Sequence, residues 1–202
     1  FYMGSIDGST PYGDIIGAGP SKDFSDPPIF LAADPNRRSL SRNEWIGEFF
    51  NTSSSPRGHG FNQSNVKTGF ACYSFQPKPD VPIKVIVLDD TQRDDYPNIW
   101  GYGHGSLDQG RYDWLVKELD MGQAEGNLMI IAAQIPIGVE EEGSPTGWWS
   151  NSYVSEEDLI KKLHTYPNLF LWISGHRHIN AVTALTSPDA DRPELGFWQV
   201  ET

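Results

Sequence analysis

Apolar runs recur from residue 69 onward and predict the strands of a sheet. The segment 69–76 alternates partly between apolar and polar side chains, which suits a strand. Three segments with long, mostly apolar runs are typical of strands that are buried on both faces: 81–90, 127–136 and 168–175. Two later segments, 179–187 and 195–201, are expected to form a closing antiparallel pair.

Amphipathic segments between these runs predict helices. Each begins at a Ser whose side chain can accept a backbone N–H of the first turn, and two of them add Glu or Gln three residues later to complete a capping box. The third has acidic residues in its first turn, which the helix dipole favours. The segments are 41–51 (Ser41 with Glu44), 106–120 (Ser106 with Gln109) and 154–167 (Ser155).

The order of these elements predicts an α/β layered architecture. Continuous apolar strands that are separated by helices imply a sheet covered on both faces. Residues 1–68 are rich in Gly, Pro, Ser and Asp and predict loops around the one helix. We therefore expect a single domain over 1–202, in which 1–68 is a loop-rich cap or insert and 69–202 carries the sheet and helices.

Composition excludes several kinds of partner. The formal net charge of −12 argues against binding to a nucleic-acid backbone or an anionic membrane, because either would need clustered Lys and Arg. Cys72 is the only cysteine, so there is no internal disulfide, and we expect its thiol to be buried in the core. No stretch is long enough for a membrane span, and the sequence assigns no compartment.

Polar side chains follow the buried runs at comparable places. Asp89 and Asp90 end one run, Gln134 ends the next, and His176 and His178 follow the last. In α/β sheets the ligand crevice lies beyond the carboxyl ends of the strands, where such groups can converge. Neutral imidazole is a good ligand for transition metals. The spacing alone leaves two readings open: a metal or catalytic site, or ordinary solvated histidines.

Several of these segments together resemble one enzyme family. "WISGHRH" resembles the C-terminal G-H-x-H motif of calcineurin-like metallophosphoesterases. "LMIIAAQIPIG" resembles the strand of that family that ends in a metal-binding His and a hydrophobic-Pro turn, and "LDQGRYDWLVKELD" resembles the helix between them. "FYMGS" and "GFWQVET" resemble a bacterial branch. The resemblance is strong over 83–185 and weak over 1–70.

Other motifs of the family are missing. The family builds its two-metal site from D-x-H, G-D-x-x-D, G-N-H-D/E, a lone His and G-H-x-H, and residues 1–202 contain none of the first three. The resemblance therefore implies an αββα-type sandwich of which this chain supplies the C-terminal half. The N-terminal half is expected from a preceding segment, a cleaved fragment or a partner chain.

The resemblance also implies cofactors and their ligands. Two divalent ions, Mn, Fe or Zn, are expected, with one or none bound by this chain alone. His176 and His178 are the expected ligands, and Gln134 stands where the family has a third His. A Gln amide oxygen is a weaker partner than imidazole for these metals. Gln134 is therefore either a metal ligand or a residue that only bonds nearby loop backbone.

The implied reaction is phosphoester hydrolysis, in which the two cations lower the pKa of a bridging water. The family's general acid belongs to the missing G-N-H motif. His59 and His104, both on Gly-rich loops, are either the candidates for a catalytic role here or ordinary loop residues. Arg177 either contacts a phosphate or faces solvent. Asp89 and Asp90 form a strand-end turn or support the ligands from behind.

Three function classes remain open. The first is a phosphoesterase acting on phosphomonoesters or phosphodiesters, whether of nucleotides, phosphoproteins, phospholipids or sugars. The second is a non-catalytic or metal-site-altered phosphoesterase-like binding module, which Gln134 and the missing motifs favour. The third is an ordinary α/β binding domain in which the H-x-H is incidental.

Overall fold

The computed structural model describes residues 40–92, 103–144 and 146–202. The chain divides into two compact units, Phe1–Leu40 and Ser41–Thr202, and nearly all of the first lies outside the described residues. The expected loop-rich character of 1–39 therefore stays a prediction. The sheet and its helices belong to the second unit.

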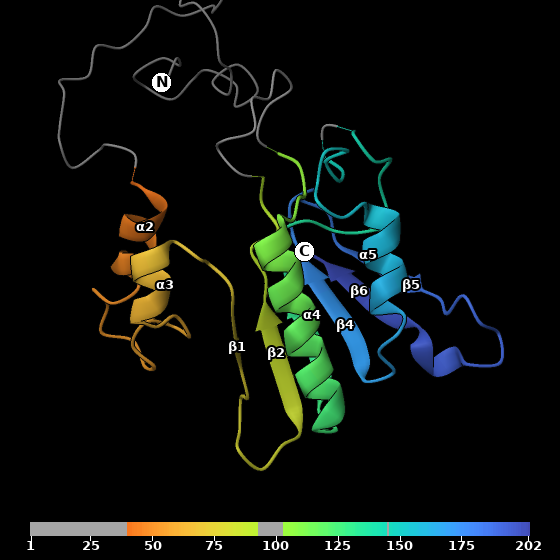
Figure 1. Ribbon diagram of the computed structural model, residues 1–202, viewed down its shortest axis with the longest axis horizontal. Coiled ribbons are helices and arrows are strands. Elements are labelled where there is room, and N and C mark those ends of the chain that lie inside the picture. Colours follow the sequence, from red (N-terminus) through yellow and green to blue (C-terminus); the bar gives the residue numbers. More distant parts are fainter. Residues whose placement is uncertain (1–39, 93–102, 145) are drawn as a thin grey trace, which may run out of the picture. The chain divides into compact units, whose positions relative to one another are not determined.

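A six-stranded mixed sheet organises this unit (Figure 1), in the order β1-β2-β3-β4-β6-β5. β2, β3, β4 and β6 are parallel, whereas β1 and β5 are antiparallel to their neighbours and form the two edges. The α/β architecture and the closing β5–β6 pair are as predicted. The strands are β1 (Tyr73–Phe75), β2 (Ile83–Val87), β3 (Leu128–Ala132), β4 (Leu169–Ser174), β5 (Ala181–Leu185) and β6 (Phe197–Glu201).

All three predicted helices are present. They are α2 (Arg42–Glu48), α4 (Gln109–Ala124) and α5 (Glu156–Leu163), and a short 3-10 turn, η3, covers Pro193–Leu195. Ser41 and Glu44 form the expected capping box, and the Ser155 hydroxyl accepts the Asp158 N–H. No helix among the described residues is long and apolar enough to cross a membrane.

The predicted cap of α4 is wrong. Asp108, rather than Ser106, is the N-cap, and its side chain accepts the Arg111 N–H at 2.9 Å. Ser106 is held before the helix because its own N–H donates to the carbonyl of Asp90 at 2.7 Å. A capping-box pattern in the sequence therefore placed this helix start two residues early.

A further helix, α3 (Gln63–Thr68), lies in the segment that we expected to be a polar loop. Asn62 caps it and Asn65 accepts the Asn62 N–H, so the pair forms a capping box built from two asparagines. The pattern search for Ser or Thr followed by Glu or Gln misses such a pair. Gly69 ends the helix in the left-handed conformation that a Gly tolerates best.

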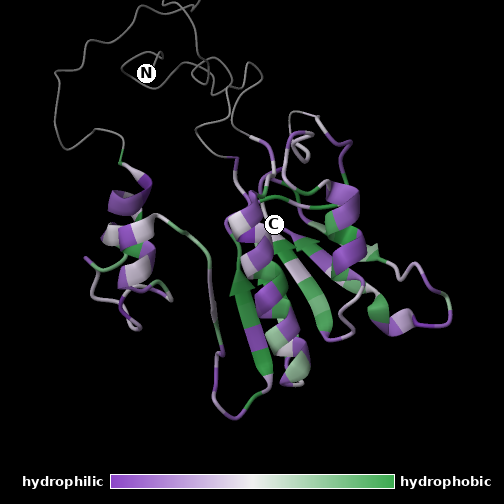
Figure 2. Ribbon diagram, viewed as in Figure 1, coloured by the Kyte–Doolittle hydropathy of each residue, from purple (hydrophilic) through white to green (hydrophobic). Residues whose placement is uncertain are grey.

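One face of the sheet is buried beneath α4 and α5. Leu115 and Leu119 of α4 and Leu159 and Leu163 of α5 are fully buried, and all belong to one core cluster with the strand residues Ile86, Met129, Ile131, Leu169, Trp172 and Phe197. Figure 2 shows the strands as largely hydrophobic ribbons behind these helices. Burial of this apolar area is the main stabilising contribution to the unit.

The opposite face of the sheet is also apolar but remains open. One row across it runs through Val85, Ile130, Leu171, Trp198 and Ala184, and the next runs through Val87, Ala132, Ile173, Val200 and Val182. Trp198 is 55% exposed and Val182 is 68% exposed. The expectation that helices cover both faces is thus met on one face only within the described residues.

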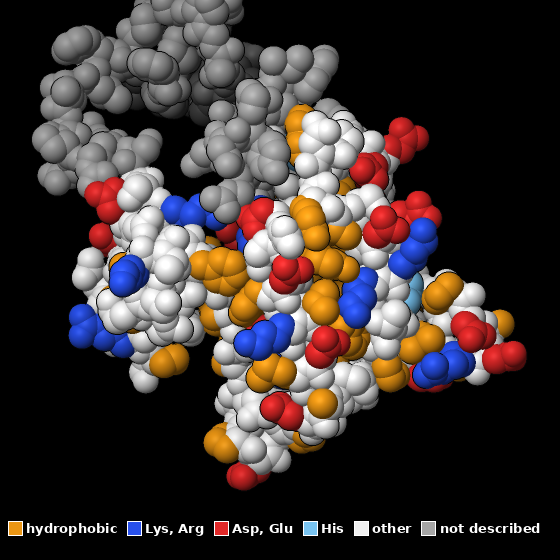
Figure 3. Space-filling view, viewed as in Figure 1, with side chains coloured by type: hydrophobic (Ala, Val, Ile, Leu, Met, Phe, Trp, Pro, Cys, Tyr) orange, Lys and Arg blue, Asp and Glu red, His pale blue; other side chains and the backbone are white. Residues whose placement is uncertain are grey.

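Charged side chains of both signs mix on the surface. On the face drawn in Figure 3, Lys and Arg lie among Asp and Glu rather than in a patch of their own. With the net charge of −12, this arrangement provides no basic surface there for a phosphate backbone.

Candidate metal centre

The carboxyl ends of β2, β3 and β4 bring the predicted residues together. Leu88 donates its backbone N–H to Ala132 at 2.9 Å, so the loop after β2 continues beside β3. Gly175 in turn donates its N–H to the Gln134 carbonyl at 3.2 Å. His176 therefore follows directly on a residue that is bonded to Gln134, and these two candidates lie at the same edge.

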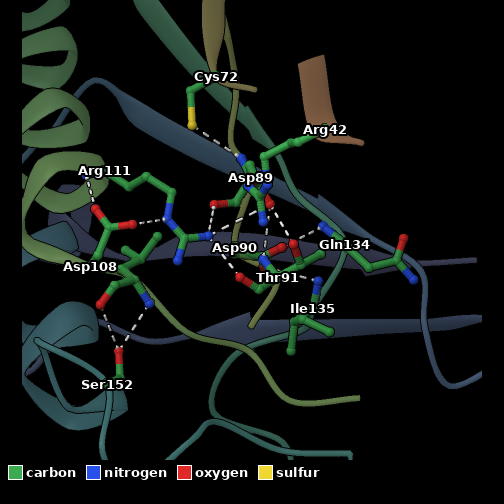
Figure 4. Close-up of polar contacts among 11 residues, drawn as sticks. Arg42, Cys72, Asp89, Asp90, Thr91, Asp108, Arg111, Gln134, Ile135 and Ser152 are labelled. Carbon is green, nitrogen blue, oxygen red and sulfur yellow. Dashed lines mark hydrogen bonds and ion pairs between the residues drawn. The ribbon is translucent and has the colours of Figure 1, made fainter. Parts of the chain in front are cut away.

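Asp90 holds the loop that carries Gln134. Its two carboxylate oxygens accept the N–H groups of Gln134 at 3.0 Å and Ile135 at 2.9 Å (Figure 4), and the side chain is fully buried. Burial raises the pKa of Asp90 to about 7, although the two N–H donors act in the opposite direction and the Asp89 charge adds to the rise. Asp90 therefore holds the backbone at Gln134, and its role in supporting a metal ligand stays a prediction.

Two more buried side chains fix the rest of this loop. The Gln199 amide of β6 accepts the Ile137 N–H at 2.8 Å and donates to the Ile137 carbonyl at 3.1 Å. Glu156 at the start of α5 accepts the Gly138 N–H at 2.9 Å. Since residues 134–138 carry backbone groups that a regular ladder does not pair, these side chains satisfy them and make the loop rigid.

Asp89 anchors the end of β2 to two helices. Its carboxylate is bonded to Arg42 of α2 and lies 3.6 Å from Arg111 of α4 (Figure 4). The buried Arg111 also donates to the backbone carbonyls of Asp89 and Thr91, each at 2.7 Å. Asp89 is thus engaged in structural contacts that fix the end of β2.

The turn that carries the histidine pair has an unusual backbone. His176 has a φ of 76° and His178 a φ of 57°, both in the left-handed region that residues other than Gly rarely occupy. Such conformations cost free energy and are found often where a side chain has a functional task. A Gly or Asn would form this turn more readily, so the geometry supports a role for the imidazoles themselves.

Arg177, between the two histidines, secures the turn. Its guanidinium donates to both carboxylate oxygens of Glu201, at 2.6 and 2.5 Å, and to Glu140 at 2.8 Å. Glu201 is the last residue of β6 and its side chain is 1% exposed. Arg177 is thus paired within the protein and does not simply face solvent, and its contact with a phosphate stays a prediction.

The side chains at this edge differ in exposure. His176 is half-buried, and its Nε2 atom is buried without a hydrogen-bond partner. Burial lowers the pKa of His176; the Glu201 charge opposes this, and His178, His104 and Arg177 reinforce it. The imidazole is therefore neutral near pH 7, which is the form that binds metals. His178 and Gln134 are exposed.

His104 lies close enough to His176 to lower the pKa of its imidazole. Its side chain is 1% exposed, and neither ring nitrogen has a hydrogen-bond partner. The ring packs against the indole of Trp149, with 4.9 Å between the ring centroids. His104 thus belongs to the same region of the molecule as the metal-ligand candidates.

Within the described residues, His59 makes local contacts. The imidazole Nε2 is 2.6 Å from the Ser54 hydroxyl, and the ring meets Phe49 edge-on with 5.6 Å between centroids. These contacts fix the loop between α2 and α3. They do not join His59 to the edge that carries His176, and its catalytic role stays a prediction.

The residues present fit one side of a metal centre rather than a complete one. The buried Nε2 of His176 has no partner and is a suitable ligand position. His178 follows two residues later in the chain, and Gln134 is bonded through its backbone carbonyl to Gly175, which precedes His176. Within the part of the chain that the structure describes, however, no three His, Cys, Asp or Glu side chains gather as a metal-binding group. Further ligands would have to come from outside these residues.

Comparison with known proteins identifies the fold. No protein-family description and no curated protein matches the chain. Among solved structures, it is similar to a dimetal phosphatase from Danio rerio, with a TM-score of 0.53 and 15% identity, over 80% of this chain and 56% of that one. The chain therefore has a mixed α/β fold like that of a dimetal phosphatase and spans little more than half of that protein's length.

Sequence reasoning missed some residues that shape this edge. Glu201 could have been found, because it ends an apolar run as Asp90 does and lies in the same sheet. No sequence pattern pointed to Trp149 or Arg111. Trp149 lies in an irregular loop, and Arg111 resembles a surface residue of an amphipathic helix. Their burial depends on long-range packing that local patterns do not report.

Proposed function

We propose that this chain is part of a metal-dependent phosphoesterase that hydrolyses phosphomonoesters or phosphodiesters. One observation carries the proposal: the unpaired, buried Nε2 of His176 lies in a strained turn at the carboxyl edge of a sheet whose fold is similar to a dimetal phosphatase. The H-x-H sequence of that turn and the Gly before it add support from the sequence.

His176 and His178 are the proposed metal ligands in this chain. The Arg177–Glu201 pair holds their turn, and Asp90 holds Gln134 beside it. Gln134, whose side chain is exposed, is the proposed third ligand through its amide oxygen. Divalent Mn, Fe or Zn ions, when bound, would polarise the phosphoryl group and supply a hydroxide nucleophile.

The complementary half of the fold is the second component of the proposal. The open face of the sheet is a wide apolar surface, and contiguous apolar surface of this kind is normally covered. In a two-sheet sandwich, a second sheet packs about 10 Å from the first, side chain against side chain. Such a layer, from another segment of the protein or from a partner chain, would also provide the remaining metal ligands.

A second candidate function is a binding module that keeps the fold but not the catalysis. It is favoured by the absence of a three-residue group of His, Cys, Asp or Glu in the described ranges and by the exposed amide at position 134. A neutral amide binds Mn²⁺, Fe²⁺ or Zn²⁺ less firmly than an imidazole does.

Hydrolysis of a chromogenic phosphodiester, measured against added Mn²⁺, tests the proposal and separates the two candidates. The wild-type protein should turn the substrate over, and Gln134→His should reach half-maximal activity at about 10- to 100-fold less Mn²⁺, because it replaces an amide with an imidazole. His176→Ala should abolish the activity.

His59→Ala is the matched control, since it removes an imidazole whose contacts lie in another loop. Its metal dependence should equal that of the wild type. Metal binding without turnover in the wild type would favour the binding module. A wild-type protein that shows neither would exclude the phosphoesterase.

A further inference from the structure

Four ring nitrogens near the candidate centre are buried and have no hydrogen-bond partner. They are Nδ1 and Nε2 of His104, Nε1 of Trp149 and Nε2 of His176. Buried polar atoms are nearly always paired, because each unpaired one costs about 1–3 kcal/mol. A cluster of such atoms at one edge of a sheet is therefore a sign of a group that binds there.

The backbone around His104 places it firmly at this edge. Gly105 donates its N–H to the Gly147 carbonyl at 3.1 Å and accepts the Trp149 N–H at 2.7 Å, so the His104 loop and the Trp149 loop form a short ladder. A Cβ atom at Gly105 would lie 2.5 Å from the Trp148 side chain and 2.9 Å from Ile135. The absence of a side chain at 105 thus brings His104 against the loop that carries Gln134.

The chemistry of these nitrogens defines what they can bind. The indole Nε1 of Trp149 is only a donor, and neutral imidazole has one donor and one acceptor nitrogen. A ligand that satisfies their N–H groups must present hydrogen-bond acceptors in a site that is mostly closed to solvent. The oxygens of a phosphoryl group are strong acceptors, and donors aimed at them have full effect in such a place.

We propose that His104 and Trp149 form the substrate-binding wall of this site and donate hydrogen bonds to the non-bridging oxygens of the bound phosphoryl group. This inference rests on the proposed function, since it takes the ligand to be a phosphoester. It assigns both Trp149 and His104 a role in substrate binding. His104 would then hold the substrate instead of acting as a general acid. Inorganic phosphate, the simplest molecule with the same oxygens, is the probe.

The experiment measures phosphate binding by calorimetry to the Mn²⁺-loaded protein. Trp149→Phe and His104→Phe each keep an aromatic ring in the packed pair and remove its nitrogen atoms. Each variant should bind phosphate about tenfold more weakly, as expected for the loss of one hydrogen bond to a charged group. Trp45→Phe, at an exposed Trp of α2, is the control and should bind like the wild type.

Two results would overturn the inference. The inference fails if the wild type does not bind phosphate, or if both Phe variants bind it as the wild type does. Thermal unfolding of each variant shows that it is folded, and the two substitutions serve as independent tests.

Hydrolysis measured on the same samples separates this inference from the proposed function. If the wild type hydrolyses the substrate but both Phe variants bind phosphate as tightly as the wild type, only the inference about His104 and Trp149 is refuted. Phosphate binding that depends on Trp149, without turnover by the wild type, refutes the phosphoesterase function alone.

Discussion

The two faces of the sheet carry the same kind of side chain but have different surroundings. Trp172 of β4 lies on the covered face and is fully buried, whereas Trp198 of β6 lies on the open face and is 55% exposed. Apolar strands of this type need cover on both sides. The covered face therefore accounts for the stability of the described unit, and the open face is where we propose that a further layer packs.

The exposed apolar surface lies on a face of the sheet and not along its edges. β1 and β5 form the edges, and every parallel strand among the described residues has a neighbour on each side. A complementary element should accordingly stack on the sheet rather than extend it.

The largest expected effect concerns residues 1–202 in isolation. With one sheet face open, we expect this segment to lack cooperative unfolding as a monomer and to bind a hydrophobic dye, because too little of its apolar area is buried. Urea unfolding with analytical ultracentrifugation measures this. A monomeric 1–202 segment with a sharp, two-state transition would contradict the account of the open face.

The matched tryptophans test whether a layer covers the open face in the natural protein. Trp172→Ala should lower the free energy of unfolding by about 3–5 kcal/mol, the usual cost of a cavity at a buried Trp. Trp198→Ala should cost a similar amount if a second sheet packs on it. A cost well under about 1 kcal/mol, typical of an exposed site, would mean that the face is open to solvent in that protein too.

Asp90, at the end of the covered face, should make stability depend on pH. Its pKa is raised to about 7 in the folded protein, from an ordinary value of 3.8. Below about pH 4 the carboxyl is protonated in both states. Between about pH 4 and 7 it ionises more readily in the unfolded chain, so the free energy of unfolding should fall by roughly 1 kcal/mol per pH unit and then level off.

Asp90→Asn is the comparison for this pH effect, because its amide does not ionise. Urea unfolding of the natural protein, with and without this substitution, at roughly pH 4, 5.5 and 7 gives the stability difference at each pH. As the pH rises, the free energy of unfolding of Asp90→Asn should increase relative to that of the wild type. A difference that is constant with pH would show that Asp90 is ionised in the folded protein throughout this range.

The sequence predicted the fold better than it predicted the site. The runs that became β2, β3 and β4, and the caps of α2 and α5, are local patterns, and the structure contains each of them. The contacts of Arg177 depend on Glu201, which is 24 residues away on another strand. Pairings of this kind follow from how strands are ordered in the sheet, which local periodicity does not report.

Metal binding by His176 is the most direct test of the central claim. The Mn²⁺ content of the natural protein after equilibrium dialysis should be lost or sharply reduced in His176→Ala and unchanged in His59→Ala. That result would place a metal at the carboxyl edge of the sheet, where the imidazole nitrogen is buried without a partner. Equal metal content in the wild type and His176→Ala would contradict the account.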